Sequence, residues 1–307
     1  MIRPLIAILT VLCFSLSLFA QDEEDSGKDL RPVKNMFEAI WVIDNQSAMV
    51  PIKGTFEFDI QHRFGRFGNG FDDFWGLYAN SNIRLGFHYV PVERLMLGFG
   101  LTKTNITWDV NAKYAILRQA RMGGSPVSLT YFVNAAVDTR DKSFFTRPND
   151  LTTADRFSYF HQLILARKVS DKFSVQAAGS LSHFNQVLGY ENPETGKEEG
   201  KWKNDHLAIS FAARYKVGDW VNLIGNYDQP ITQHNDDSIQ PKPNFSIGVE
   251  LTSSSHQFQI FVGNYYFITP QRNNMFNQND FFSEDINHGF NRNSLLIGFN
   301  MSRLWNF

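Results

Sequence analysis

Cysteine is almost absent from this chain, and its scarcity excludes several kinds of chemistry. The single cysteine, Cys13, lies in an apolar segment at the N-terminus. If export removes that segment, disulfides, thiolate catalysis and cysteine-based metal sites are all excluded. Lipidation of Cys13 is not favoured, because Leu12 precedes it where a small residue is needed.

An excess of charge is also lacking. The first twenty residues contain one charged side chain, Arg3, so the rest of the chain has 28 basic and 31 acidic residues and a net charge of −3. Nucleic-acid binding is not predicted, because it depends on concentrated positive charge. The sequence contains no phosphate-cradling glycine loop, and no cofactor is predicted.

Residues 1–20 have the organisation of a secretory signal peptide. Arg3 is followed by an apolar run from Leu5 to Phe19, and Ala20 precedes a polar stretch that begins at Gln21. The run is shorter than the roughly 18–20 residues that a spanning helix needs. We therefore expect export, with residues 21–52 as a periplasmic leader and residues 53–307 as the folded domain.

No later apolar run is long enough for a membrane helix, yet the chain contains 29 Phe, 10 Tyr and 6 Trp. The apolar residues instead alternate with polar ones, as on a β-strand with two different faces. In the stretch from Thr55 to Phe64, Phe56, Phe58 and Ile60 alternate with Glu57, Asp59 and Gln61. A membrane barrel would turn the first set to lipid and the second to its lumen.

About twelve segments show this alternation, although its parity is less regular in the sixth. They cover residues 55–64, 82–89, 95–102, 107–116, 127–137, 157–169, 173–183, 206–217, 220–227, 245–251, 256–268 and 295–307. The sequence thus predicts an all-β fold, a transmembrane antiparallel up-and-down β-barrel of about 12 strands in the outer membrane.

The connections between these segments favour a membrane barrel over a soluble one. Tight connections at 90–94, 170–172, 218–219 and 252–255 take turns with long ones at 65–81, 139–155, 184–204, 228–243 and 269–293. The connection at 103–105 is short where a long one is expected, and 118–126 is intermediate. Outer-membrane barrels have short periplasmic turns and long extracellular loops.

The chain ends on Phe307, two residues after Trp305. A terminal aromatic on the last strand is typical of the signal that the barrel-assembly machinery reads. The expected partners are this machinery, outer-membrane lipid and lipopolysaccharide and, for a conduit, a small solute.

Charged residues on the predicted inner faces are the candidate functional residues. A charge in the bilayer midplane costs a few kcal/mol, so these side chains are expected to line the lumen. They are Glu57, Asp59, Arg63, Arg84, Asp109, Lys113, Arg214 and Glu250. They line a water-filled pore in one interpretation and form a salt-bridged filling in the other.

The leader has a second apolar stretch, from Met36 to Ile43, followed by the turn-like residues 44–47. One interpretation is a periplasmic lid or lumenal plug, and the other is a short pairing strand or loose leader.

Several stretches resemble the uncharacterised outer-membrane β-barrels of Bacteroidota catalogued as domain of unknown function 5777. They are residues 43–47, 58–65, 74–77, 82–87, 113–114 and 117–119, and the remainder is similar only as a generic barrel. The resemblance implies a barrel fold and an outer-membrane location, and it supplies no functional residues.

Other possible sites are weaker. Five histidines on strands (His62, His88, His161, His183 and His206) lack metal-ligand spacing. Ser182 and His183 are adjacent on a strand and so face opposite sides. Asp72–Asp73 and Asp236–Asp237 lie in long loops, and the amide- and aromatic-rich last loop is typical of a sugar-binding surface or of a loop folded into the barrel mouth.

Three functions remain open from the sequence. The first is a porin-like conduit for small solutes. The second is a closed barrel that acts as an envelope scaffold or secretion-associated component. The third is an outer-membrane hydrolase. It has the least support, because no catalytic constellation lies on one strand face. A non-enzymatic role is therefore expected.

Overall fold

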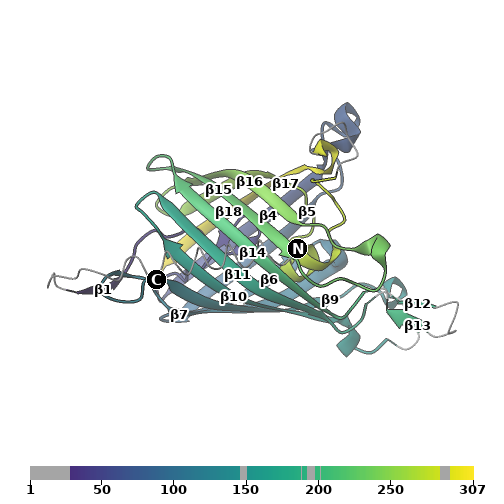
Figure 1. Cartoon of the computed structure of the whole chain (residues 1–307), viewed down its shortest axis with the longest axis horizontal. Coiled ribbons are helices and arrows are strands. Elements are labelled where there is room, and N and C mark those ends of the chain that lie inside the picture. The colour runs from purple at the N-terminus through teal and green to yellow at the C-terminus, as the bar shows by residue number, and fades with distance from the viewer. Residues whose placement is uncertain (1–27, 146–150, 188, 192–197, 201, 284–290) are drawn as a thin grey trace, which may run out of the picture.

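A computed structural model shows that twelve antiparallel strands close into a barrel (Figure 1). The structure describes residues 28–145, 151–187, 189–191, 198–200, 202–283 and 291–307. The predicted signal peptide, with Cys13, lies outside them. The barrel strands are β4 (Thr55–Arg66), β5 (Asn82–Val92), β6 (Leu95–Thr102), β7 (Thr107–Leu117), β9 (Ser128–Asp138), β10 (Phe157–Lys168), β11 (Phe173–Phe184), β14 (Asp205–Lys216), β15 (Val221–Pro230), β16 (Asn244–Thr252), β17 (His256–Gly263) and β18 (Leu296–Asn306).

Each barrel strand pairs with the strands before and after it in the chain, and β18 pairs with β4 to close the ring. The register at the closure runs from Asn306 opposite Thr55 to Leu296 opposite Arg66, with one irregularity between Leu296 and Gly298. Closure leaves no free sheet edge, which is what a hydrocarbon environment requires of a β structure. The predicted fold and strand number are therefore confirmed.

Alternation along the strands separates an exposed outer face from a buried inner face. On β4 every second residue from Thr55 to Gly65 is buried, and Phe56, Phe58 and Ile60 lie between them on the outside. The outer wall carries many exposed apolar side chains, including Trp108, Leu163, Phe211 and Ile260. This arrangement suits a wall in contact with lipid.

Short connections lie at one end of the barrel and long ones at the other, except that residues 103–106 form a short connection at the long-loop end, as the sequence predicted. Residues 93–94, 169–172, 217–220 and 253–255 form the short turns. At the same end β1 (Asp29–Pro32) pairs with β8 (Ala120–Met122), which accounts for the intermediate length of the 118–126 connection. Figure 1 shows β1 at one end and the small β12 (Gly189–Glu191) and β13 (Glu198–Gly200) pair at the other.

The eleventh strand is shorter than predicted, because it ends at Gly263 rather than near residue 268. Asn264 leaves the strand pattern: its side chain accepts a hydrogen bond from the backbone N–H of Phe245 and donates to the carbonyl of Pro243. Tyr265 and Ile268 are then fully buried. The chain turns into the barrel and forms the helix α2 (Pro270–Phe276) before it returns to β18.

Six short 3-10 helices lie in the connections of the described chain. They are η1 (Phe67–Asp73), η2 (Thr104–Ile106), η3 (Lys142–Phe144), η4 (Ala154–Arg156), η5 (Asp237–Ile239) and η6 (Arg292–Ser294). None of the helices in the described residues has the length and apolar composition needed to cross a bilayer.

Candidate functional site: the barrel lumen

All eight charged residues predicted to line the lumen are buried. Their relative exposures lie between 0% and 3%, and they are Glu57, Asp59, Arg63, Arg84, Asp109, Lys113, Arg214 and Glu250. The structure does not gather them into one cluster. Some pair with one another across the wall, and others contact a segment of chain that lies inside the barrel.

Arg84 on β5 is held between two carboxylates. Its guanidinium makes two hydrogen bonds to Asp109, of 3.0 and 2.9 Å, and Nη1 lies 3.5 Å from Asp59 Oδ1. Asp59 also lies 3.1 Å from His88 Nδ1. A buried cation placed between two anions in this way is compensated from both sides, which a buried charge requires.

Glycines make room for this group of charges. A side-chain carbon added at Gly86 would collide with Asp59, and one added at Gly100 would collide with Arg84 and Asp109. Gly86 lies on β5 and Gly100 on β6, both among residues that alternate with outward apolar ones. Glycine at such positions is a signal that sequence reasoning did not use. Because these glycines have no side chain, they leave the space that Arg84, Asp59 and Asp109 occupy.

Residues 36–50 lie inside the barrel, and we call this segment the plug. It contains the two-residue strands β2 (Trp41–Val42) and β3 (Asn45–Gln46), joined by a tight turn in which Ile43 has a φ of +59°. Every residue from Phe37 to Ala48 is buried except Glu38, which is half-buried. The two strands pair only with each other and not with the barrel wall.

Lys113 is the wall residue with the most contacts to the plug backbone. Its ammonium group donates to the carbonyl oxygens of Ile40, Ser47 and Met49, at 3.0, 3.1 and 3.2 Å. Three carbonyls satisfy the three donors of one lysine, so this charge is buried with its hydrogen-bonding capacity filled.

Neutral wall side chains bind the rest of the plug backbone. Gln176 donates to the carbonyl of Gln46, Gln259 to that of Trp41, and Asn300 to that of Ile43, at 2.7, 2.9 and 2.6 Å. Thr130 donates to the carbonyl of Ala48. These residues come from β11, β17, β18 and β9, so the plug is held from all around the barrel.

Two ion pairs join the plug to the wall. Arg214 lies 2.6 Å from Glu38 and 3.5 Å from Glu250. Arg63 lies 3.5 Å from Asp44, and its guanidinium packs 4.6 Å from the centre of the Phe261 ring. Glu57 and Asp59 both lack a hydrogen bond to their carboxylate oxygens within the described residues, but Asp59 lies beside Arg84 and His88, whereas Glu57 forms no ion pair there.

The plug also packs its apolar side chains against the wall. One cluster joins plug residues such as Phe37, Val42 and Ile43 to wall residues that include Ile164 and Ile224. A second joins Ile40 and Trp41 to Val90 and Met96. Inward-facing apolar residues on β10 explain why the sixth predicted strand had irregular parity: its inner face is partly apolar because it receives the plug.

A second segment enters the barrel from the end with the long loops. In α2, Gln271, Asn273 and Met275 are fully buried, and Gln271 donates to Asn134 on β9. Asn273 donates to Asp44 of the plug at 2.6 Å. Of the two interpretations of the last loop, folding into the mouth describes residues 264–277, and residues 284–290 lie outside the described chain.

The remaining candidate residues do not assemble into a reactive group. Ser182 is fully buried while the neighbouring His183 faces outward and lies 2.8 Å from Asp205, so the serine and histidine are on opposite faces. Asp73 accepts from the backbone of Gly76, and Asp236 accepts from that of Ser238. The described residues contain no group of three or more histidine, cysteine or acidic side chains arranged to hold a metal.

Among the groups outside the barrel strands, His234 and Asp29 have displaced pKa values. Burial, reinforced by the nearby charge of Lys203, lowers the pKa of His234 to about 4. A hydrogen bond from the side chain of Arg31 is the largest cause that lowers the pKa of the exposed Asp29 to about 2. His234 is therefore neutral and Asp29 charged at neutral pH.

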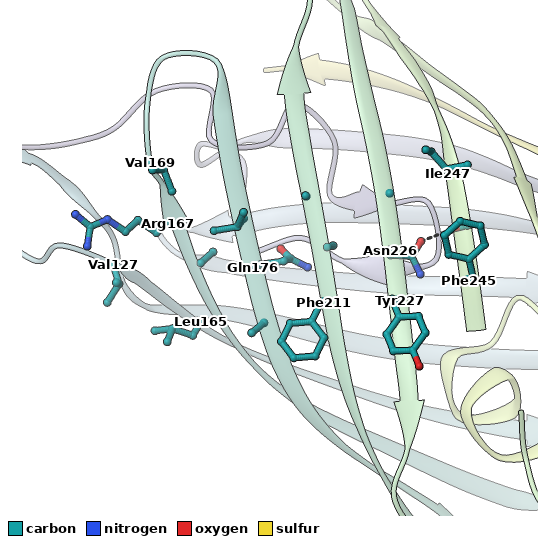
Figure 2. Close-up of a pocket in the computed structure, with 17 residues that line it drawn as sticks. Val127, Leu165, Arg167, Val169, Gln176, Phe211, Asn226, Tyr227, Phe245 and Ile247 are labelled. Carbon is teal, nitrogen blue, oxygen red and sulfur yellow. Dashed lines mark hydrogen bonds between the residues drawn. The ribbon is translucent and has the colours of Figure 1, made fainter. Parts of the chain in front are cut away.

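One hollow lies on the outer wall and not in the lumen. It has a volume of about 670 Å³ and spans β10 to β16. Figure 2 shows Leu165, Phe211, Tyr227 and Phe245 in a row along it. The small outward residues Ala213 and Gly225 form its floor. Since this face contacts lipid, the hollow is not part of the lumenal site.

A closed barrel with an apolar outer wall and a polar, occupied interior defines a membrane-spanning β-barrel protein. The chain belongs to the family described as a membrane-bound β-barrel domain, DUF5777, whose profile matches residues 37–305. This confirms the family expected from the sequence and extends it to nearly the whole barrel. The match also begins within the plug rather than at the first barrel strand.

Solved barrels of similar architecture include an outer membrane channel from Pseudomonas putida F1, with 11% identity, a TM-score of 0.48, and coverage of 84% of this chain and 97% of that one. The NanC porin has 6% identity and a TM-score of 0.47, with 82% and 99% covered. The KdgM porin has 9% identity and a TM-score of 0.41, with the same coverage. No curated protein matches the chain.

Proposed function

We propose that this protein is an outer-membrane, porin-like conduit for small solutes whose lumen is closed by the plug. The observation that carries the proposal is how the plug is attached. Its strands β2 and β3 pair only with each other, and polar wall side chains bind its backbone. Withdrawal of the plug would break no strand pairing of the barrel, and water could replace each of these hydrogen bonds.

The buried charges on the wall are of both signs. The carboxylates are Glu57, Asp59, Asp109, Asp138, Asp228 and Glu250, and the cations are Arg63, Arg84, Lys113 and Arg214. A conduit lined in this way would pass small solutes of either sign, with a weak preference for cations.

The test is the conductance of planar bilayers with three forms of the chain. One begins at residue 21, one at residue 35, which removes β1 and keeps the plug, and one at residue 51, which removes both. We expect discrete conductance steps only from the third form. A fourth form would also replace residues 270–277 by a glycine–serine sequence of equal length, to remove the contribution of α2. If both plug-free forms fold, as judged by heat-modifiable gel mobility, and stay silent, the proposal is wrong.

The second candidate function is a closed envelope scaffold. It is favoured by the link between the two lumenal segments, in which Asp44 of the plug accepts from Asn273 of α2 and lies beside Arg63. A lumen filled from both ends and joined by this contact is expected in a barrel that does not conduct. Silence of the plug-free forms, together with a stable complex after mild cross-linking in cells, would support this role. A hydrolytic activity has no comparable support.

The location and orientation of the protein in the cell are part of the proposal. We infer that residues 1–20 are a signal peptide, that the short-turn end and the N-terminus face the periplasm, and that Phe307 is read by the barrel-assembly machinery. Phe307 follows β18 and is 88% exposed, so it is accessible to a partner. Phe307→Ala should reduce the amount of folded protein in the outer-membrane fraction, and the outward Phe258→Ala should not. Mass spectrometry of the mature N-terminus tests the cleavage.

A further inference from the structure

A polar cavity lies at the long-loop end of the barrel, outside the plug. Its volume is about 450 Å³, within the roughly 300–1,000 Å³ of small-molecule sites. Most of its lining comes from the end of β4 and the loop that follows it, with further residues from the chain between β17 and β18. The polar lining residues are Arg66, Asn69, Asp73, Asn80, Tyr266, Asn279 and Asn293.

The loop that forms most of this cavity is held in a strained conformation. Phe74, Trp75 and Gly76 have consecutive φ values of +52°, +53° and +82°. Such angles are unfavourable for a residue with a side chain, and strain of this kind is concentrated at functional sites. Asp73 supports the turn, because its carboxylate accepts from the backbone of Gly76 at 2.8 Å.

Glycine–glycine contact fixes the loop to the end of the barrel. The backbone N–H of Gly65 donates to the carbonyl of Gly76 at 2.9 Å, and a side chain on either glycine would collide with the other segment of the loop. The cavity is therefore shaped before any ligand arrives, which reduces the entropy lost on binding.

The strained turn presents aromatic rings to solvent. The Phe71 and Trp75 rings lie 4.3 Å apart, and Trp75 also contacts Phe74 edge-on. Phe71 is 77% and Tyr78 is 85% exposed. Four aromatic residues in one loop would normally pack into a core, so their exposure on a rigid turn indicates that something else covers them.

Amide groups in the cavity are available to a ligand. Within the described residues, the side chains of Asn80 and Asn293 make no hydrogen bond, although Asn80 accepts from Tyr266 through its backbone. Each free amide offers two donors and an acceptor. Arg66 and Asp73 contribute one charge of each sign, so the cavity has no net charge to select an ion.

We propose that this cavity and its aromatic turn bind a short, uncharged oligosaccharide. A sugar ring has hydroxyl groups that both donate and accept, which match the amides of Asn80 and Asn293, and an apolar face that can stack on Trp75. This inference concerns the outer mouth and does not depend on whether the lumen conducts.

The test is isothermal titration of the full mature chain in detergent with four neutral hexasaccharides: maltohexaose, cellohexaose, xylohexaose and laminarihexaose. We expect saturable binding of at least one of them. The paired substitution Asn80→Ala with Asn293→Ala should weaken binding about tenfold or more, a free-energy loss of at least about 1.4 kcal/mol. Trp75→Ala should weaken it comparably.

The matched control for Trp75→Ala is Trp220→Ala, because Trp220 is 65% exposed in a short turn at the opposite end of the barrel. That substitution should leave binding unchanged. Failure of all four sugars to bind, an equal loss with Trp220→Ala, or equally tight binding of a charged hexagalacturonate would overturn the proposal. So would a Trp75→Ala variant that keeps its sugar affinity and loses only its retention in vesicles, since the turn would then be a lipid anchor.

Discussion

The two halves of the lumen wall are built differently, although both belong to the same alternating barrel. The wall from β4 to β7 turns charged side chains inward, with Arg84 held between Asp59 and Asp109. The wall from β10 to β15 turns more small or apolar residues inward, among them Ile164 and Ala178, beside polar ones such as Arg214. We call these two parts the charged half and the apolar half. Both bind the plug through polar groups, as Lys113 and Gln176 do, but the larger apolar cluster with the plug lies in the apolar half.

This difference indicates that the interior is specific for its own plug rather than a generic channel lining. The plug fits the lumen in this orientation because rotation would separate Lys113 from the three plug carbonyls that it binds, and the apolar plug residues from the wall residues that they pack against. In the charged half, the loss of one partner leaves a buried charge uncompensated and lowers the stability of the folded protein. In the apolar half, a truncation lowers stability mainly through the apolar contact area that is lost.

The largest expected loss of stability follows from a substitution in the charged half of the wall. Arg84→Met leaves Asp59 and Asp109 buried without their shared cation, and breaking such a group typically costs about 3–5 kcal/mol. We expect the free energy of unfolding in guanidinium, followed by tryptophan fluorescence in lipid vesicles, to fall by that amount. Arg303→Met, at an exposed position, is the control. Adding Asp109→Asn to Arg84→Met should restore part of the loss, and no recovery would argue against the electrostatic cause.

The next effect is in the apolar half. Ile164 is fully buried against the plug, so Ile164→Ala should lower the free energy of unfolding by about 2 kcal/mol, the lower end for such truncations. The outward Ile260→Ala should cost less. In a chain that begins at residue 51 the Ile164 substitution should also cost less, because its plug neighbours are gone. An equal cost with and without the plug would show that the halves do not differ in the way described.

A smaller effect is expected outside both halves, at His234. Its pKa is lowered from 6.5 to about 4 by burial, so the unfolded loop gains a proton before the folded one does. The contribution of neutral His234 to the stability of the loop is fully present above pH 6.5 and is lost as the pH falls toward 4. The Lys203 amide donates to His234 Nδ1, so its NMR signal should shift across this window. His234→Gln should remove the transition, and a transition that persists would have another origin.

The smallest effect is expected at Asp29, on the exposed β1. Its pairing with Arg31 lowers its pKa to about 2, so the carboxylate is charged at pH 7 and the pairing is lost only as the pH falls through that value. Since the pair is exposed and screened by salt, Asp29→Asn should leave the thermal midpoint unchanged at physiological ionic strength. A shift of several degrees would show that β1 stabilises the barrel as the lumen contacts do.

Sequence reasoning was most successful where the surroundings of a strand are uniform. On β4 the outward Phe56 and Phe58 face one medium and the inward Glu57 and Asp59 another, so alternation alone predicted their faces. It was least successful on β10 and after β17. Inward residues such as Ile164 are apolar because of the plug, and the eleventh segment was predicted too long because Tyr265 enters the lumen.

The sequence by itself determined the closed ring, its strand number and the residues that face inward, because hydrocarbon outside and polar groups inside impose a two-residue period on every strand. Only the tertiary structure decided what fills the ring. The contacts of the plug join residues as far apart in the chain as Ile43 and Asn300, and the strands that form hydrogen bonds with the plug each do so through one or two residues. No local pattern encodes a set of contacts that exists only after the strands have closed around the segment.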